Sequence, residues 1–441
     1  MASKPRMPMT PSAPDISRLL QQLSLQMEKD PGLPLAWLEG HRQDPNLMAA
    51  LKGASADVPV AAVLTCYELI LRQDLIAAGH AIEKHRRPDD PLQVNILLDG
   101  LFFAACRDFI RASQLLVSVV NRHKGSLFIW QKMLTLCLNA GYYSQGIDWY
   151  QQAIALPGWG AAARFNLMEL GSALYALDYQ FERAIAIRRE ELALQMQRPP
   201  ASPAAKSSDF NVAKTWQALT AVVDLLEGHG MRPVPTAGTL LGWWREGAIL
   251  NNDKDLDVAL MPADSLDLAR KIMLAQVRYI AAPMSLNSNS YSCFFDRVTQ
   301  VTVDLLQFWD AGEKLGYGWL LPGKYRAQSR VLHFDRFDLL RDHWQGHEFW
   351  RPDDPDHFLT QMYGPWRAPD PHFDSCAGVP NLQAMTEMVQ ATVYNQLVSC
   401  VSRGNYAKAM ALIVSLRDHN DDHPVLGRME IWLRKNLQNQ C

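Results

Sequence analysis

One short span, Gly238–Leu260, carries a small-residue turn, an arginine and three alternating aspartates, and it constrains this chain more than any other segment. Asp253, Asp255 and Asp257 occupy every second position and lead into the apolar run Val258–Met261. If this run is a strand, the three carboxylates point to one side, because successive side chains of a strand alternate between its faces. Three carboxylates on one face repel one another unless a cation neutralises them. Hard oxygen ligands of this kind favour Mg²⁺ or Mn²⁺, so the span predicts a divalent-metal site.

A second segment, Gln300–Trp309, supplies a further carboxylate. It is β-branched and apolar apart from Asp304, so it predicts a core strand with one charge that needs a partner. Placed beside the first strand, Asp304 completes a three-carboxylate metal cage with Asp255 and Asp257, and Asp253 is a further ligand at the loop edge. Because Mg²⁺ usually completes its shell with water and substrate phosphate, this arrangement predicts a phosphoryl-transfer centre.

The turn at Gly238 and Thr239 precedes the aspartates and leads into an expected short helix, Leu240–Glu246. Backbone N–H groups at the start of a helix bind phosphate, so Gly238 and Thr239 are candidate donor-binding residues. Arg245 is the candidate for clamping a diphosphate, because a guanidinium binds such groups bidentately. The structural alternatives are that Gly238 is an ordinary turn glycine and that Arg245 is a surface residue of the helix.

Separate blocks in this order and at this spacing resemble the LicD/fukutin family over about residues 210–385. The blocks are G-T-L-L-G-x-x-R from Gly238 to Arg245, D-x-D-x-D, the later strand aspartate, and two tail segments, Trp344–Pro352 and Tyr363–Pro369. The resemblance implies a nucleotidyltransferase-fold domain that uses a divalent metal. Members of this family transfer phosphocholine or a phospho-polyol such as ribitol phosphate from a CDP-activated donor, for example CDP-choline or CDP-ribitol, onto a glycan.

The chain departs from the family pattern at one place. Many bacterial members read P-W-D-D-D where this chain reads Asn251-Asn-Asp-Lys-Asp255. The side chain of Lys254 should point to the face opposite the three aspartates, because Lys254 lies between Asp253 and Asp255 and side chains of a strand alternate. The fukutin branch resembles this chain in having a lysine there, so the motif is expected to bind metal.

These parts predict a phosphotransferase acting in surface polysaccharide or glycoconjugate synthesis. Asp255, Asp257 and Asp304 are expected to hold one or two Mg²⁺ or Mn²⁺ ions on the diphosphate of a CDP-linked donor, with Asp304 as general base and CMP as leaving group. The transferred group (ribitol phosphate, glycerol phosphate or phosphocholine), the acceptor glycan and the oligomeric state stay open. Two alternatives remain: a nucleotidyltransferase that attaches the nucleotide itself, and a non-catalytic repeat scaffold.

Several aromatic and histidine residues have structural interpretations that we prefer. Trp243 and Trp244 are expected to pack in the core rather than bind a base. The sequence His343–His347 contains a Gln-Gly pair that predicts a hairpin turn rather than a metal site. His347–Glu348 lacks the second histidine of a zinc-protease motif.

Composition limits the class of protein. At 441 residues, with 48% hydrophobic and 20% charged residues, the chain is typical of a globular protein of two or three domains. A net charge of -3 with scattered basic residues argues against nucleic-acid binding. The most apolar stretch, Val58–Leu71, contains Pro59 and Glu68, so no membrane span is expected. Seven cysteines without C-x-x-C spacing favour reduced, mostly buried thiols, and we expect a cytoplasmic protein or one peripheral at a membrane.

The N-terminal half predicts a helical repeat. Residues 15–198 show helical periodicity and a recurring turn-and-alanine signature. The small residues of that signature are separated by 34, 34 and 38 positions, and the signature occurs once more near the C-terminus; the positions are Ala78, Ala112, Gly146, Ala184 and Ala409. This period resembles tetratricopeptide-type helix pairs, with unrelated helical hairpins as the alternative.

The expected fold class is therefore α+β and multidomain. Expected limits are a disordered lead at 1–14, tetratricopeptide-like repeats at 15–198, a linker at 199–209, the nucleotidyltransferase-fold domain at 210–385 and repeat-like helices at 386–441. Within the domain, Asp209 is expected to cap a helix from Phe210 to about Glu227, and a strand near Pro233–Thr236 to precede the Gly238 turn. The repeats are expected to hold a long glycan or to bind a polysaccharide-assembly protein.

Overall fold

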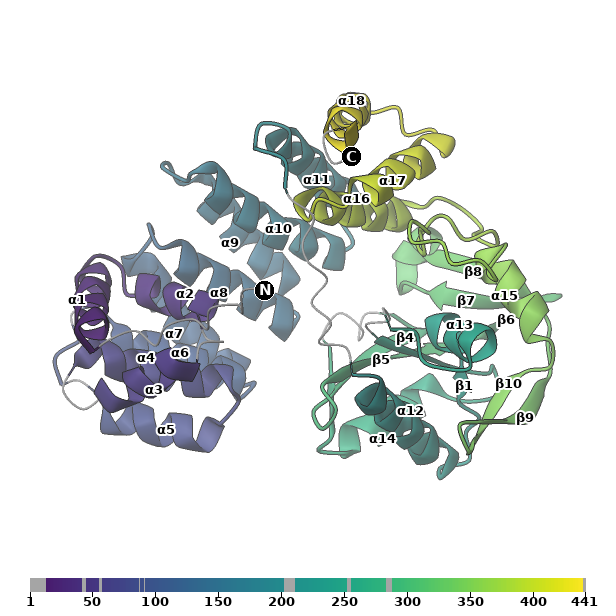
Figure 1. The fold of residues 1–441 in the computed structure, drawn as a ribbon, viewed down its shortest axis with the longest axis horizontal. Helices are drawn as coiled ribbons and strands as arrows, with labels where there is room; N and C mark the ends of the chain where they lie inside the picture. The colour runs from purple at the N-terminus through teal and green to yellow at the C-terminus, as the bar shows by residue number, and fades with distance from the viewer. Residues whose placement is uncertain are drawn as a thin grey trace, which may run out of the picture. The chain divides into compact units, whose positions relative to one another are not determined.

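The computed structural model of the chain describes residues 13–41, 45–54, 58–86, 88–90, 92–201, 211–251, 255–282 and 288–438. The chain divides into two compact units, Met1–Gly171 and Ser172–Cys441. The first consists of helices in its described part, and the second combines helices with small sheets (Figure 1). The predicted mixed architecture, with a helical N-terminal region and a later sheet domain, is confirmed.

Most successive helices of the first unit pack against one another along the chain. The last of them, α10, begins in this unit and ends in the second. The helices are α1 (Ala13–Lys29), α2 (Gly32–His41), α3 (Pro45–Ala54), α4 (Pro59–Leu71), α5 (Leu75–Lys84), α6 (Val94–Ala105), α7 (Phe109–Arg122), α8 (Leu127–Ala140), α9 (Tyr143–Ala155) and α10 (Ala161–Leu177).

Five turns between paired helices in the described chain share one backbone conformation. Each has a residue with φ between 60° and 75°, which is followed by the residue that caps the next helix; the positive-φ residues are Gln73, Arg107, Gly141, Tyr179 and Gly404. The N–H of each capping residue donates to a carbonyl five residues earlier, as in Asp108 to Phe103 at 2.9 Å. The small residues of the repeated signature all lie buried in the first turn of the following helix. The signature therefore marks the turn of a helix pair, and the region is consistent with a repeat array.

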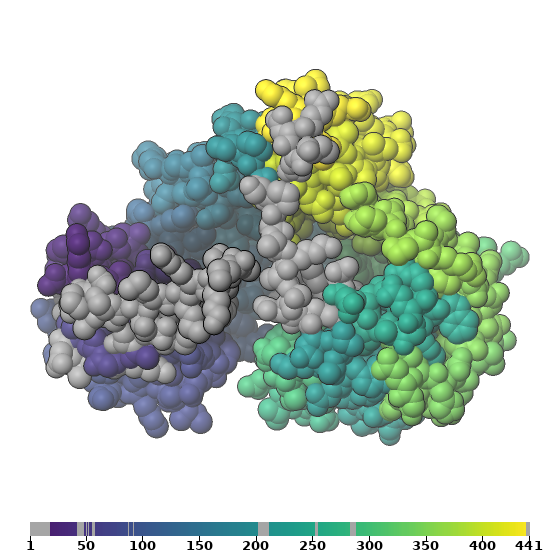
Figure 2. All heavy atoms as spheres, in the orientation of Figure 1, coloured from purple at the N-terminus to yellow at the C-terminus, as the bar shows by residue number. Residues whose placement is uncertain are grey.

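The C-terminal helices of the second unit pack on α11 (Phe181–Gln195), the helix that follows α10. They are α16 (Glu387–Ser402), α17 (Tyr406–Asp418) and α18 (Pro424–Gln438). Arg188 of α11 is buried, donates to Glu191 at 2.7 Å and also donates to Asn395 of α16 at 2.6 Å. The space-filling view shows the teal surface of α11 beside the yellow C-terminal helices (Figure 2).

A five-stranded sheet forms the centre of the remaining part of this unit. Its order is β1-β2-β5-β4-β3, and β2 and β5 are parallel while the other neighbours are antiparallel. The strands are β1 (Val234–Pro235), β2 (Asp255–Leu260), β3 (Tyr279–Ala281), β4 (Tyr291–Asp296) and β5 (Val301–Gln307). The two strands expected from the aspartate-bearing segments are thus neighbours in the structure.

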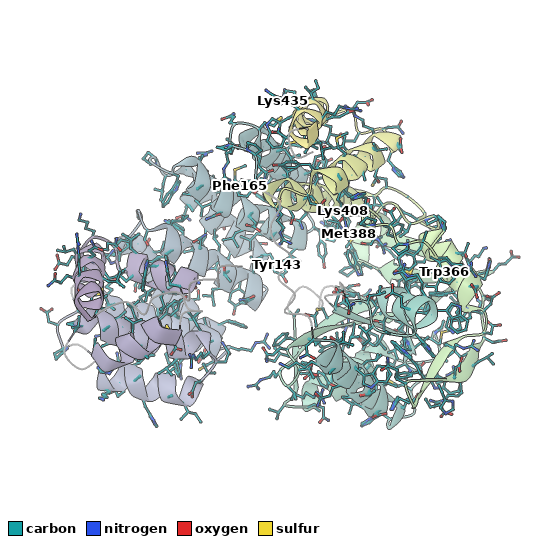
Figure 3. The ribbon with its side chains drawn as sticks, viewed as in Figure 1. Tyr143, Phe165, Trp366, Met388, Lys408 and Lys435 are labelled. Atoms are coloured by element: carbon teal, nitrogen blue, oxygen red, sulfur yellow. The ribbon has the colours of Figure 1, made fainter. Side chains whose placement is uncertain are left out.

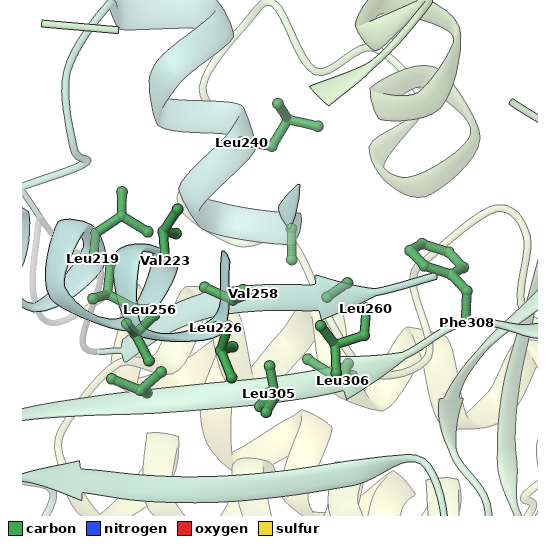
Figure 4. Packing of buried hydrophobic residues seen from close by; sticks show 14 of the residues in the cluster. Leu219, Val223, Leu226, Leu240, Leu256, Val258, Leu260, Leu305, Leu306 and Phe308 are labelled. Carbon is green, nitrogen blue, oxygen red and sulfur yellow. The ribbon is translucent and has the colours of Figure 1, made fainter. Parts of the chain in front are cut away.

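The apolar face of this sheet is covered by α12 (Val212–Glu227) and α14 (Leu266–Ala275). Leu256 and Val258 of β2 and Leu305 of β5 are buried there against the leucines and valines of α12 (Figure 4). Burying such a side chain contributes about 1.5–3 kcal/mol. Because side chains alternate along a strand, this packing leaves the polar positions of β2 and β5 on the opposite face.

Smaller sheets and helices complete the domain. A three-stranded antiparallel sheet has the order β6-β7-β8, and β9 pairs with β10 in a hairpin. The Gln-Gly pair forms the hairpin turn, as predicted, with φ of 50° at Gln345 and 81° at Gly346. The remaining elements are α13 (Ala237–Glu246), β6 (Trp309–Ala311), β7 (Lys314–Trp319), η2 (Gly323–Gln328), β8 (Arg330–Asp335), β9 (Leu339–Trp344), β10 (His347–Pro352) and α15 (Pro355–Tyr363).

Some expected boundaries differ from the observed ones. The first helix of the domain begins at Val212, and its cap is Asn211, whose side chain accepts from the N–H of Lys214. The expected cap Asp209 and the expected first residue Phe210 lie outside the described residues. The short helix after the turn begins three residues earlier than expected, at Ala237, so that the turn residues belong to its first turn.

Two further expectations can be compared with the described chain. Among the described helices, none combines the length and apolar character that a membrane crossing requires. The described cysteines form no disulfides, and three of them are buried: Cys66, Cys137 and Cys376.

Candidate functional site

Carboxylates gather on the face of the five-stranded sheet that α12 and α14 leave uncovered. Asp255 and Asp257 of β2 are half-buried there, whereas Leu256 between them is buried on the other face. The register of β2 and β5 places Asp257 directly opposite Asp304. Residues directly opposite each other on neighbouring strands share one face of the sheet, so the structure brings all three aspartates to the same face.

Asp257 is held by the start of α13. Its carboxylate Oδ2 accepts from the N–H of Gly238 at 3.1 Å, and its own N–H donates to Oγ1 of Thr239 at 2.9 Å. The cap residue Thr236 makes no side-chain bond to the helix, so the Asp257 carboxylate occupies the position of a helix cap. The positive end of the helix dipole favours an ionised carboxylate here. Gly238 and Thr239 therefore lie at the predicted site, where they bind an aspartate.

The backbone at this helix start is strained. Ala237 has a φ of 42°, in the left-handed region that costs a residue other than glycine about 1–2 kcal/mol. Strained backbone conformations cluster at functional sites, because the surrounding structure must hold them in place. The strained residue directly precedes Gly238, whose N–H donates to Asp257.

Asp304 has two polar neighbours on the adjoining strand β4. The hydroxyl of Tyr291 donates to Oδ1 of Asp304 at 3.0 Å, and Cys293 stands directly opposite Asp304 in the register. Burial, together with the charge of Asp255, raises the pKa of Asp304 to about 6, and hydrogen bonds from Cys293 and Tyr291 oppose this rise. A raised carboxyl pKa next to a second carboxylate is the electrostatic signature of a site that would gain from a bound cation.

Three further groups on this face stay protonated at neutral pH. Burial is the main cause that raises the pKa of Tyr291 and of Cys293, and Asp304 raises both further. Tyr317 of β7 is buried, and burial followed by the charge of Asp257 raises its pKa. These three neutral groups therefore add no positive charge to the carboxylate face.

Arg245 lies at the other end of α13 from Gly238. Seven residues of helix separate the two positions, which corresponds to roughly 10 Å of rise. The guanidinium of Arg245 donates to the carbonyl of Trp366 at 3.2 Å and pairs with Glu246 at 2.8 Å. Trp366 is labelled in Figure 3 on the segment that follows α15. The structure thus connects Arg245 with the second tail segment, not with the three aspartates, and its contact with a donor stays a prediction.

The tryptophans next to Arg245 are packing residues, as expected. Trp243 is buried and stacks on Trp344 of β9, with ring centroids 5.2 Å apart and planes 4° apart. The indole N–H of Trp244 donates to Asp356 of α15 at 3.0 Å. Trp243 thus joins the Gly238–Arg245 block to the first tail segment, and Trp244 joins it to α15.

Asp253 and Lys254 lie outside the described residues, so the predicted role of Asp253 and the predicted direction of Lys254 stay untested. Within the part of the chain that is described, no three His, Cys, Asp or Glu side chains converge closely enough to hold a metal ion as they stand. The donor set still suits Mg²⁺ or Mn²⁺, because it consists of hard carboxylate oxygens and one of the carboxyls has a raised pKa.

Three residues of this face were not identified from the sequence: Tyr291, Cys293 and Tyr317. The alternation of residues 291–296 does predict a strand, with tyrosine and cysteine on one of its faces. Which face that is, and which strand lies beside it, depends on long-range pairing. The register that places Cys293 opposite Asp304 cannot be predicted from the local sequence.

Comparison with known proteins identifies a domain that includes this site. Residues 230–352 match the family model described as LicD/FKTN/FKRP, nucleotidyltransferase domain. The matched segment contains all three aspartates, the Gly238 turn and Arg245. A domain of this family implies a phosphotransferase-type function on glycans. No repeat family is detected in the helical region, and no curated protein matches the chain.

Proposed function

We propose that this protein transfers a phospho-group from a CDP-activated donor to a hydroxyl of a glycan and releases CMP. The transferred group is a phospho-polyol, such as ribitol or glycerol phosphate, or phosphocholine. The observation that carries the proposal is the pairing of Asp257 with Asp304 across β2 and β5, within the segment that matches the nucleotidyltransferase domain. Two opposed carboxylates on one face, with a third beside them, are the chemistry that a metal-diphosphate complex requires.

Asp255, Asp257 and Asp304 would hold Mg²⁺ or Mn²⁺, with Asp253 as a further candidate. A bound divalent ion supplies neutralisation of the negative charge on the donor diphosphate and on the leaving group. Asp257 is fixed for this role by Gly238 and Thr239. These two residues and Arg245 remain the proposed contacts of the donor phosphates.

Asp304 is the proposed general base. It accepts the proton of the acceptor hydroxyl while the acceptor oxygen forms a bond to phosphorus. The bond between that phosphorus and the oxygen of CMP breaks, and CMP leaves with the electron pair. Without metal, burial and the charge of Asp255 raise the pKa of Asp304 to about 6. A bound divalent ion would keep this carboxyl ionised and so able to accept the proton.

The test is a panel of CDP-linked donors, incubated with the protein, Mn²⁺ and candidate glycans. The proposal predicts CMP release that increases when the correct glycan is present. The mass of the glycan product distinguishes the second candidate, a nucleotidyltransferase, which the description of the matched domain favours. A mass increase by the phospho-polyol or phosphocholine supports the proposal, whereas attachment of CMP supports nucleotidyl transfer.

For the helical region we propose binding of a long glycan acceptor or of a polysaccharide-assembly protein. Removal of residues 1–198 would also remove α11, which packs against α16. A shortened chain that begins at residue 178 keeps α11 with its partners. Transfer to a short acceptor, combined with loss of transfer to a long glycan, is the result expected if the helices bind the glycan.

A further inference from the structure

Tyr291 has a fixed position on the carboxylate face. Its backbone carbonyl accepts from the guanidinium of Arg270 at 2.8 Å, on the side of the sheet covered by α14. Its ring packs on Trp319 of β7, with ring centroids 5.5 Å apart. Because both the backbone and the ring are held, the direction of the hydroxyl is determined by the fold.

The hydroxyl of Tyr291 lies close to two groups, Asp304 and Cys293. It donates to Oδ1 of Asp304 at 3.0 Å, across the antiparallel pair of β4 and β5. The thiol of Cys293 is a second hydrogen-bond donor to Asp304, but a thiol is a weak donor. Among the described neighbours, the tyrosine is therefore the group that restricts the orientation of this carboxylate most strongly.

We propose that Tyr291 is a positioning residue that orients the Asp304 carboxylate for metal binding and proton removal. The inference rests on the proposed function, in which Asp304 has both roles. Groups that hydrogen-bond to a metal ligand orient it and tune its basicity, and their loss commonly lowers metal affinity or activity by about 10–100-fold. Tyr291 acts in this way without contacting the donor or the acceptor.

The test compares two variants that each lose one tyrosine hydroxyl from the same sheet. Tyr291→Phe keeps the ring and its packing on Trp319 but removes the hydrogen bond to Asp304. Tyr279→Phe, on β3, is the matched control, because the Tyr279 hydroxyl is buried and has no hydrogen-bond partner among the described residues. Thermal unfolding of both variants establishes that the fold is retained.

The first readout is Mn²⁺ binding by isothermal titration calorimetry, with wild type and Asp304→Asn as references. We expect Tyr291→Phe to weaken Mn²⁺ binding by about tenfold or more and Tyr279→Phe to leave it unchanged. The Mn²⁺ concentration for half-maximal CMP release should rise in parallel. Wild-type Mn²⁺ affinity in Tyr291→Phe overturns the inference.

A second readout separates failure of the inference from failure of the proposed function. In metal-free protein with ¹³C-labelled aspartate carboxyls, the resonance that disappears in Asp304→Asn identifies Asp304. If wild type and Asp304→Asn bind Mn²⁺ equally, Asp304 does not bind the metal and that part of the proposed function fails. The chemical shift of the Asp304 resonance then tests separately whether Tyr291 orients the carboxylate. A shift in Tyr291→Phe but not in Tyr279→Phe supports positioning, and an unchanged resonance in both variants overturns it.

Discussion

Gly242 lies where α13 approaches the backbone that leads towards β2. A Cβ added at Gly242 would lie 2.6 Å from the carbonyl oxygen of Ala248 and 3.1 Å from the side chain of Leu250. A contact of 2.6 Å with a backbone atom cannot be relieved by rotating a side chain. The second glycine of the G-T-L-L-G block is therefore required by packing, although glycine is unfavourable within a helix.

Gly242→Ala should destabilise the protein by about 1–3 kcal/mol, because overpacking outweighs the better helix propensity of alanine. Gly40→Ala is the control, since Gly40 lies within α2 and an added Cβ there meets nothing within 4 Å. That substitution should stabilise by about 0.5–1 kcal/mol. Urea unfolding measures both changes, and equal effects of the two substitutions would show that Gly242 is not tightly packed.

Thr239 joins two elements, α13 and β2. It is buried, and its Oγ1 accepts from the backbone N–H of Asp257. β1 ends at Pro235, so at Asp257 a side chain supplies the acceptor in place of a neighbouring strand. The position of the carboxylate strand relative to α13 depends on this hydroxyl.

Thr239→Val should destabilise the protein by about 1–3 kcal/mol, because it leaves the Asp257 N–H buried without an acceptor. Thr239→Ser keeps the hydroxyl and should retain most of the stability. Urea unfolding gives the stabilities, and CMP release should fall with Thr239→Val alone. Similar stability and activity in the valine and serine variants would contradict the role assigned to this hydrogen bond.

At the scale of elements, the alternation of side chains along a strand can be predicted from the sequence more readily than the pairing of strands. The alternation of Asp255, Leu256 and Asp257 predicts which side chains share a face, and the structure agrees. The strand that carries Asp304 is also expected beside β2, because its charge needs a partner, but the parallel direction of the pair is seen only in the structure. The third strand, β4, with Tyr291 and Cys293, could not be placed in advance, because its position depends on contacts between segments distant in sequence.

At the scale of the whole molecule, the recurring signature predicts helix pairs but not their partners. It marks the turn before α11, and α11 also packs against α16 and α18 in the second unit. Arg189 of α11 pairs with Asp421 at 3.0 Å, and Tyr394 donates to the same carboxylate at 2.8 Å. A contact between residues more than two hundred positions apart has no local signal in the sequence.

Asp421 should make the stability of this helical contact depend on pH. Burial alone would raise the pKa of Asp421, but hydrogen bonds from Tyr394 and from the His423 N–H, with the charge of Arg189, outweigh burial and lower it. A carboxyl with a lowered folded pKa stabilises the fold above its unfolded pKa of about 3.9 and loses this contribution as pH falls through the folded pKa.

Asp421→Asn should therefore destabilise the packing of α16 by about 1.5–3 kcal/mol at pH 7, because Arg189 loses its carboxylate partner, and by less near pH 3. Amide hydrogen exchange in α16 measures the loss of stability at pH 7. Urea unfolding between pH 7 and pH 3 measures how this loss decreases as the pH falls. Asp422→Asn is the control, because Asp422 is exposed. If the free energies of unfolding of wild type and Asp421→Asn differ by the same amount from pH 7 to pH 3, the predicted pH dependence is contradicted.

The central claim is that the opposed carboxylates of β2 and β5 catalyse phospho-group transfer with release of CMP. The most direct measurement is CMP formation from the CDP-linked donor panel with Mn²⁺ and glycan, for wild type and for Asp304→Asn. We predict glycan-stimulated CMP release by wild type that is lost when Mn²⁺ is chelated and that falls by about 10²–10⁴-fold in Asp304→Asn. CMP release that is unchanged in Asp304→Asn, or absent for every donor and glycan with wild type, would contradict the claim.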